Sequence, residues 1–153
     1  MALITPALQT YSILATSIAA VTNLSTSIVT FPALLHAQPP TLTKQWHILY
    51  TSGRVPAVSA AMTGAAGFAV LAYRIATTRN LYLAAAAITL SLVPYTALTM
   101  FPTINELSRR AQAGDKDEKG DTRALVEKWG RLNLWRGVLL LTAAGLGTWA
   151  SVI

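Results

Sequence analysis

Residues 55–73 read VPAVSAAMTGAAGFAVLAY, an apolar run that contains no charged side chain. A bilayer core about 30 Å thick is crossed by about 20 helical residues that each rise about 1.5 Å. This run is therefore long enough to cross a membrane as a helix. Three further runs are predicted to be spans for the same reason: residues 7–35, 81–104 and 132–153.

These four runs predict an all-α fold, an integral membrane four-helix bundle that runs up-down-up-down as one domain over residues 1–153. The alternative is a soluble bundle whose long helices are buried. Soluble helices need a polar face, and these runs lack one, so the membrane prediction is favoured. The first run has no basic segment before it and is longer than a signal-peptide core, so we expect it to be the first span.

The composition excludes several kinds of site. The chain has no cysteine, which excludes disulfides, thiolate nucleophiles, iron–sulfur clusters and thiolate zinc sites. His36 and His47 are the two histidines, and neither has carboxylates near it in the sequence, so we predict no metal site. There is also no Gly-rich nucleotide-binding loop.

The net charge of +6 has two explanations. A basic protein can bind nucleic acid, but basic residues of a membrane protein gather in cytosolic loops, and we favour the second explanation. Most basic residues fall near residues 36–54 and 105–131, so we expect these loops in the cytosol and the protein in the endoplasmic reticulum or a related endomembrane. The stretch 108–123 mixes both charge signs and is expected to be mobile and solvated.

Small residues are dense in the second and third runs. In lipid, such residues let helix backbones approach closely, so we interpret them as packing faces. Asn23, in the middle of the first run, is expected to hydrogen-bond across helices. The small-residue faces would also suit a homo-oligomer or a partner protein; they comprise Ala60, Ala61, Gly64, Ala65, Ala66, Gly67 and residues 84–87.

Polar and aromatic side chains gather at the ends of the runs that face the predicted cytosolic side. Residues three or four apart on a helix share a face. Strongly polar groups at membrane depth are costly, so they usually face inward and have a function. We therefore predict a pocket just inside the cytosolic interface, formed by Trp46, His47, Tyr50 and Arg54, by Thr96, Thr99, Thr103 and Asn105, and by Trp129, Asn133 and Arg136.

Each of these residues also has a purely structural explanation. Tryptophans at such positions are typical of the interfacial belt, and Arg54 can extend its charge to lipid headgroups. Asn105 can cap a helix after Pro102, and the threonines can donate to carbonyls of their own helix. Arg136 is the strongest candidate for a pocket residue, because it lies a turn or two deeper than Trp129.

Three segments carry a resemblance to a known family. They are WHILYTSGR at residues 46–54, PYTALTMFPTINEL at residues 94–107 and WGRLNLWR at residues 129–136. Their order and spacing between four apolar runs resemble the DUF1772 family of small membrane proteins, which includes fungal anthrone oxygenases. The resemblance covers nearly the whole chain, and its most specific parts are the second and third segments.

The resemblance implies an enzyme of secondary metabolism that oxidises an apolar, anthrone-like aromatic polyketide to a quinone. It implies O₂ as co-substrate and no flavin, haem or metal cofactor. The positions that match the family's segments, and are implied to bind or shape the substrate site, are Trp46, Tyr50, Pro94, Thr96, Pro102, Asn105, Trp129, Asn133 and Arg136.

The implied reaction suggests roles for individual side chains. Loss of a proton from the anthrone methylene gives an electron-rich enolate, which needs a base and a partner for its oxygen. We expect His47 to be the base and Arg136, with Asn133 or Asn105, to hold the oxyanion. Side chains expected to bind the flat substrate are Trp46, Tyr50, Thr96, Thr99, Thr103 and Trp129.

Two other functions are compatible with the same residues. The base and the oxyanion partner could catalyse a redox-neutral cyclisation or isomerisation of a polyketide-derived enol. Alternatively, the chain could be a non-catalytic membrane carrier or accessory subunit, which the Gly/Ala-rich helices would suit. A channel or pump is disfavoured, because no acidic residue lies within a predicted span.

Overall fold

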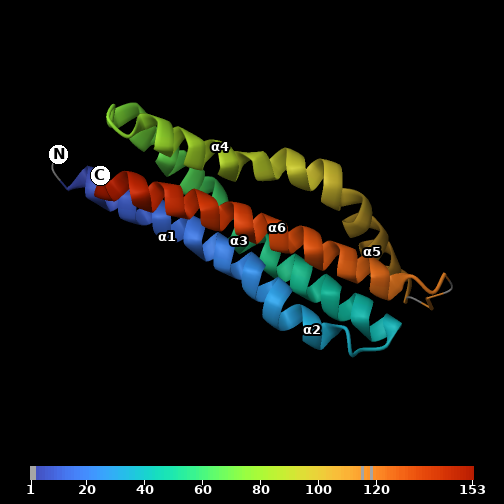
Figure 1. The fold of residues 1–153 in the computed structure, drawn as a ribbon. Helices are drawn as coiled ribbons and strands as arrows, with labels where there is room; N and C mark the ends of the chain where they lie inside the picture. Colours follow the sequence, from blue (N-terminus) through green and yellow to red (C-terminus); the bar gives the residue numbers. More distant parts are fainter. Residues whose placement is uncertain (1–2, 115, 118) are drawn as a thin grey trace.

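The protein is described here by a computed structural model, which covers residues 3–114, 116–117 and 119–153. Over this part of the chain the fold is entirely helical, as predicted (Figure 1). The elements in chain order are α1 (Ile4–Ser25), η1 (Thr26–Thr30), α2 (Phe31–Leu34), α3 (Pro39–Arg74), α4 (Arg79–Tyr95), η2 (Thr96–Met100), α5 (Phe101–Ala113) and α6 (Thr122–Val152).

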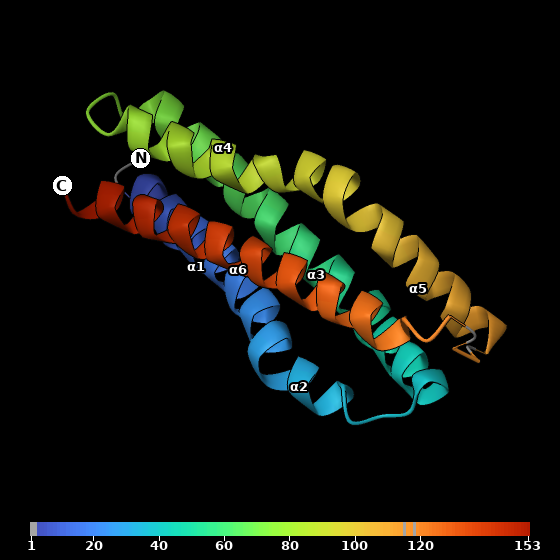
Figure 2. The same cartoon turned by 45° about the vertical axis from the view of Figure 1, so that its right-hand side comes forward.

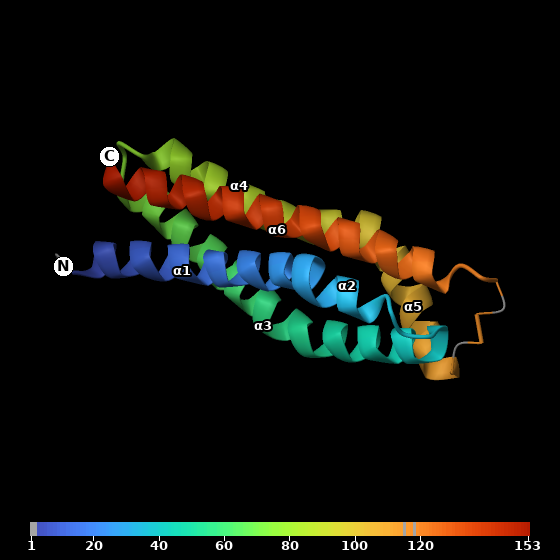
Figure 3. The same ribbon diagram turned by 60° about the horizontal axis from the view of Figure 1, so that its bottom comes forward.

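Four long helical columns form the bundle. Helix α1 packs against α3 and α6, and α4 packs against the same two helices, so α1 and α4 occupy opposite corners. Both termini and the α3–α4 turn lie at one end of the bundle (Figures 1 and 2). The end of α2, the start of α3, the end of α5 and the start of α6 lie at the other end (Figure 3). The up-down-up-down topology is therefore confirmed.

The helices extend beyond the predicted spans at their charged ends. Helix α3 begins at Pro39 rather than near residue 55, and α6 begins at Thr122 rather than near residue 132. Apolarity marks the part of a helix that can lie in lipid, and a polar helix turn outside the lipid leaves no such mark. Pro56 lies inside α3 and does not end it.

Two short π-helical segments, η1 and η2, interrupt the first and third columns. Each one comes directly before a Phe-Pro pair, Phe31–Pro32 or Phe101–Pro102, at the start of the next helix. Proline lacks an N–H donor and pushes against the carbonyl four residues earlier, and a wider π turn accommodates that conflict. The third column bends visibly between α4 and α5 (Figure 2).

Three helical stretches among the described residues are long and apolar enough to cross a membrane: Ile4–Leu34, Pro39–Arg74 and Arg79–Ala113. Large apolar side chains of α1, such as Leu14, Ile18 and Val21, are exposed on the outside of the bundle. Such a surface suits lipid rather than water. Helix α6 is not among the three stretches; its apolar part, residues 132–153, contains Arg136. Its role as a fourth span stays a prediction.

The small residues of α3 are packing contacts, as predicted. A side chain added at Gly64 would collide with the hydroxyl oxygen of Thr16 on α1, and one added at Gly67 would collide with that of Ser12. Ala61 and Ala65 on the same helix are also buried. Helices α1 and α3 therefore approach closely along these glycines, the arrangement that small residues permit in membranes.

The connection between α5 and α6 is shorter and better anchored than the sequence suggested. Helix α5 continues to Ala113, well past residue 108, where the mobile loop was predicted to begin. Arg110 is buried, and its guanidinium contacts a carboxylate oxygen of Glu106 at 2.8 Å and one of Asp121 at 2.7 Å. It also donates to the hydroxyl of Thr122. This ion-pair cluster ties the end of α5 to the start of α6; residues 115 and 118 lie outside the described part.

The cluster makes stability depend on pH in the acid range. Glu106 lies beyond the apolar part of the third column, and hydrogen bonds from Arg109 and Arg110 lower its pKa from 4.5 to about 2. A lowered carboxyl pKa stabilises the fold fully above the unfolded-state value, and this stabilisation is lost as the pH falls from 4.5 toward about 2. We expect the Tm of detergent-purified protein to decrease over this interval. Glu106→Gln should have a lower Tm near neutral pH and a flatter profile below it; an unchanged profile would contradict the assignment.

Candidate active site

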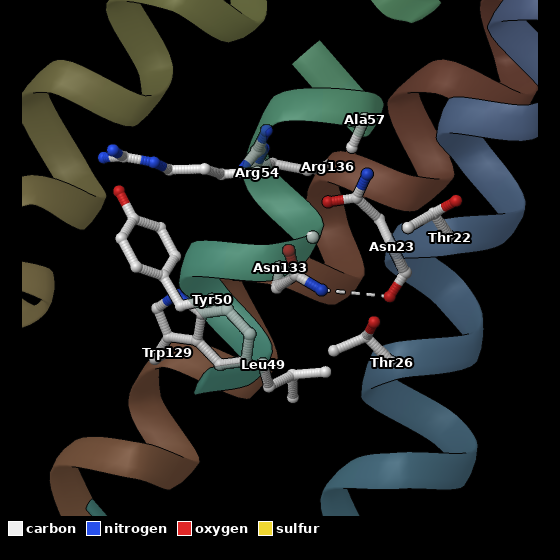
Figure 4. Close-up of a pocket in the computed structure, with 11 residues that line it drawn as sticks. Thr22, Asn23, Thr26, Leu49, Tyr50, Arg54, Ala57, Trp129, Asn133 and Arg136 are labelled. Atoms are coloured by element: carbon white, nitrogen blue, oxygen red, sulfur yellow. Dashed lines mark hydrogen bonds between the residues drawn. The ribbon is translucent and has the colours of Figure 1, made fainter. Parts of the chain in front are cut away.

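A small polar cavity lies where α1, α3 and α6 meet, and it has a volume of about 40 Å³. A space of this size holds a water molecule or a substrate oxygen, not an aromatic ring system. The residues that line it are Thr22, Asn23, Thr26, Leu49, Tyr50, Gly53, Arg54, Ala57, Trp129, Asn133 and Arg136 (Figure 4).

Asn133 is fixed at the bottom of this cavity by two hydrogen bonds. Its amide nitrogen donates to the backbone oxygen of Asn23 and to the hydroxyl oxygen of Ser27, each at 3.0 Å. The first of these bonds joins α6 to α1 in Figure 4. Asn23 in turn donates from its amide to the carbonyl of Ala19. Both asparagines are buried, so their orientation is held by α1 and the start of η1.

A larger apolar groove adjoins the polar cavity, between α3 and α4, with a volume of about 490 Å³. Ligand sites for small molecules usually have volumes of about 300–1,000 Å³, so this groove can accept a ring system. Tyr50, Arg54 and Arg136 line both the groove and the polar cavity. The remaining lining residues of the groove are Val55, Val58, Ser59, Ala61, Met62, Thr89, Leu92, Val93, Thr96 and Phe101.

Arg136 stands where the two spaces meet, and it has no carboxylate partner among the described residues. One terminal nitrogen lies 3.9 Å from the sulfur of Met100, and the buried Nε has no hydrogen-bond partner. Arg54 lies over the Tyr50 ring, with its guanidinium carbon 5.8 Å from the ring centroid. The lining residues of both spaces include no Asp or Glu. Arg136 is half-buried without a counter-ion among the described residues, and the exposed Arg54 adds a second positive charge beside it, so the pair favours a ligand with an anionic oxygen.

A cluster of aromatic rings supports this site from behind. Trp46 is stacked on Tyr50, with ring centroids 5.4 Å apart and planes 2° apart. The Trp129 ring meets Trp46 edge-on at 5.6 Å. Trp46 is fully buried and Trp129 nearly so, which excludes an interfacial-belt position for either residue, whereas Trp135 is largely exposed. The cluster thus fixes the Tyr50 ring at the wall of the cavity.

The structure brings part of the predicted pocket together and leaves part of it outside. Tyr50, Arg54, Trp129, Asn133 and Arg136 line the polar cavity, and Thr96 lines the groove. The remaining predicted residues, Trp46, His47, Thr99, Thr103 and Asn105, line neither space.

The prediction that Asn105 shares a hollow with Asn133 and Arg136 is wrong, because Asn105 is exposed on α5. Thr99 is also exposed and donates to the carbonyl of Tyr95, and Thr103 is buried away from the groove. The reason for the two threonines is η2: a π turn holds more residues than an α turn, so Thr99 and Thr103 leave the face that carries Thr96. Asn105 lies about two and a half turns after Thr96 even on a regular α-helix, so helical spacing alone puts it on the opposite face.

His47 does not reach either space. Its ring lies beside Trp46, with centroids 6.3 Å apart, and its Nδ1 is buried without a hydrogen-bond partner. Three residues of the first column were missed as cavity walls: Thr22 and Asn23 on α1, and Thr26 at the start of η1. The sequence signal for this wall is Asn23, a polar residue within an apolar run, which was expected only to hydrogen-bond across helices.

These features define a class: a small helical membrane protein with a polar cavity beside a larger apolar groove. Comparison with known sequences then narrows the class. The family model for anthrone oxygenase matches residues 46–146. This match spans the walls of both spaces on α3, α4 and α6, and the chain belongs to the anthrone oxygenase family.

Curated relatives agree with the family match. The chain is 39% identical over 132 residues to an anthrone oxygenase of Claviceps purpurea, covering 80% of this chain and 76% of the relative. It is 36% identical over 112 residues to anthrone oxygenase nsrD of Aspergillus novofumigatus, covering 71% and 69%. It is 31% identical over 148 residues to anthrone oxygenase encC of Aspergillus fumigatus, covering 82% of each. No solved structure matches the chain. The protein is an anthrone oxygenase-like enzyme of secondary metabolism.

Proposed function

We propose that the protein oxidises an anthrone-like aromatic polyketide to the corresponding quinone with O₂ and without a cofactor. The observation that carries this proposal is the position of Arg136, which has no carboxylate partner in the described part of the chain and lies between a polar cavity and a ring-sized groove. In a member of this family, that arrangement suits a flat substrate whose oxygen becomes anionic.

The reaction needs no external reductant. The methylene carbon of the anthrone loses two C–H bonds and gains a C=O bond, which is a four-electron oxidation. O₂ accepts the four electrons: one oxygen atom becomes the new carbonyl and the other leaves as water with the two hydrogens. The first step is removal of one methylene proton, which leaves a delocalised enolate that can pass an electron to O₂.

The role of the protein in this scheme is chiefly electrostatic. Arg136, supported by Arg54, would bind the enolate oxygen and lower the barrier to its formation. Asn133 donates both amide hydrogens, to the backbone oxygen of Asn23 and to the hydroxyl of Ser27. Its side-chain oxygen is left as an acceptor for a hydroxyl or a water in the cavity, so the enolate oxygen is assigned to Arg136 and not to Asn133. Tyr50 lines both spaces and would contact the substrate beside Arg54, while Trp46 covers one face of its ring.

The proton acceptor is a separate proposal. We retain His47 as the base only through an intervening water or a movement of its helix, since its ring lies outside both spaces. The free Nδ1 is compatible with a proton relay. Replacing His47 with glutamine should remove a pH-dependent limb from the kcat profile; an unchanged profile would exclude it as the base.

The reaction class is tested with isotopic oxygen. Membranes that contain the protein are supplied with a hydroxylated anthrone under ¹⁸O₂, and quinone formation and O₂ uptake are followed together. We expect one labelled oxygen atom in the quinone and one O₂ consumed per quinone, above the spontaneous rate in membranes without the protein. Turnover should survive dialysis against a chelator. A rearranged product formed without O₂ would support the redox-neutral cyclase or isomerase instead.

The cellular setting is also proposed. We place the loops at residues 36–54 and 105–131 in the cytosol, with the membrane being that of the endoplasmic reticulum or a related compartment. The support is the charge pattern, in which Arg74 and Arg79 are the basic residues near the opposite turn. Cysteine labelling from the cytosolic side of sealed vesicles should modify a cysteine introduced at Asn105 and not one introduced at Tyr73.

A further inference from the structure

We propose that the groove between α3 and α4 is a lateral entrance through which the aromatic substrate passes from the bilayer to Arg136. This inference rests on the proposed function and adds the route and the subsite that binds the rings. The groove supplies nearly all of the ring-sized space in the site, because the adjoining polar cavity is only about 40 Å³.

The walls of the groove face lipid. Val55, Val58, Met62, Val93 and Phe101 line it, and all five are exposed on the surface of the bundle. They lie within two of the stretches that can cross a membrane. Exposed apolar side chains at that depth contact acyl chains rather than water, so the mouth of the groove opens into the hydrocarbon region.

The position along the helices supports the same conclusion. The wall from Val55 to Met62 covers about 10 Å of α3 at about 1.5 Å per residue. Helix α3 continues for several turns on both sides of this wall, from Pro39 to Arg74. Residues 39–54 are polar turns outside the apolar run, so the groove extends from the cytosolic edge of the span, at Val55, about 10 Å into the hydrocarbon region.

Prolines lie in both helices that form the groove. Pro56 lies in α3 and Pro94 in α4, and η2 follows directly after α4. Each proline removes one backbone hydrogen bond from its helix. The third column bends between α4 and α5, beside the groove (Figure 2).

The chemistry of the groove identifies its occupant. Its outer walls are apolar, and its inner end carries Arg54 and Arg136 with no acidic lining residue. A polycyclic aromatic molecule dissolves in the bilayer, and its acidic oxygen would meet these cations as it enters. A phospholipid acyl chain lacks an anionic group at the buried end and so gains nothing from them.

The test narrows the entrance without touching the polar residues. Val58→Trp places a bulky ring at the mouth, where Val58 is 47% exposed. Val70→Trp is the matched control, since Val70 lies on the same helix, is 43% exposed and lines neither space. With substrate supplied in vesicles, we expect Val58→Trp to lower kcat/KM by at least about tenfold with kcat nearly unchanged, and Val70→Trp to match the wild type.

A binding measurement separates this inference from the proposed function. Quenching of tryptophan fluorescence by a hydroxyanthraquinone in vesicles reports binding without turnover, with each variant compared with its own unliganded signal. Weaker binding to Val58→Trp than to Val70→Trp supports the entrance even if the wild type does not consume O₂, a result that would overturn only the function. Equal kinetics and equal binding in the two variants overturn the entrance. The entrance would also be overturned if a phospholipid chain cross-links to residue 58 and excess hydroxyanthraquinone, added before the cross-linking, does not lower the yield of that cross-link.

Discussion

Replacing Arg136 with glutamine is expected to lower kcat about a hundredfold, the usual effect of removing one donor that stabilises a developing oxyanion. The loss corresponds to about 3 kcal/mol of transition-state stabilisation. KM should change much less, because the enolate charge develops after the neutral anthrone has bound. Arg136→Lys should retain an intermediate rate, since it keeps the charge but not the planar pair of donors. Steady-state kinetics in membranes, normalised to the amount of folded protein, measure kcat and KM of Arg136→Gln and the rate of Arg136→Lys.

The control for this experiment is Arg131→Gln on the same helix. Arg131 is exposed and lines neither space, so its replacement should leave kcat and KM at wild-type values. Equal losses in the two variants would show that Arg136 acts on stability or insertion rather than on chemistry. Wild-type turnover by Arg136→Gln would remove the electrostatic mechanism altogether.

Placing alanine at Gly64 is expected to destabilise the bundle by about 1–3 kcal/mol, the usual result of overpacking a tight contact. The added methyl would occupy the space of the Thr16 hydroxyl, and the nearest backbone oxygen, that of Ser12, would be 3.2 Å away. If α1 and α3 moved apart, Asn23 on α1 and Tyr50 on α3 would no longer be held at the wall of the cavity. The free energy of unfolding, measured by denaturant titration in mild detergent, tests this expectation.

Gly145→Ala is the matched control, and it should raise the free energy of unfolding instead of lowering it. Nothing lies within 4 Å of a side-chain carbon added at Gly145, so the substitution only favours the helical backbone. Alanine is about 0.5–1 kcal/mol better than glycine inside a helix. A stabilised Gly64→Ala variant would show that α1 and α3 are not packed as closely as described.

The sequence predicted the architecture because the signals for it are strong and local. Uncharged runs, glycines spaced for close helix contact and an uneven distribution of basic residues each indicate one feature of a membrane bundle. The ends of the helices were predicted less accurately than their apolar parts, because segments such as residues 39–54 and 122–131 are helical without being apolar. The α5–α6 connection was predicted to be mobile because its composition is polar, and the long-range contacts of Arg110 could not be read from spacing.

The positions of the predicted site residues were obtained only in part. On α3 and α6, regular α-helical spacing brings Tyr50, Trp129, Asn133 and Arg136 to the wall of one cavity. On the third column, η2 changes the register for Thr99 and Thr103. Asn105 was expected in the site from its place at the cytosolic end and from the family resemblance, whereas α-helical spacing puts it opposite Thr96. Pro102 indicated that the helix is interrupted, but the sequence does not show whether the interruption is a kink or a π turn.

The central claim is that an aromatic substrate lies between α3 and α4 with its oxygen at Arg136. The most direct test is an experimental structure of the protein in lipid nanodiscs with a bound hydroxyanthraquinone. We predict planar density in the groove beside Val58 and Thr96, with one ligand oxygen about 3 Å from a guanidinium nitrogen of Arg136. Ligand density elsewhere, with the groove closed by side chains or filled by lipid, would contradict the proposed site.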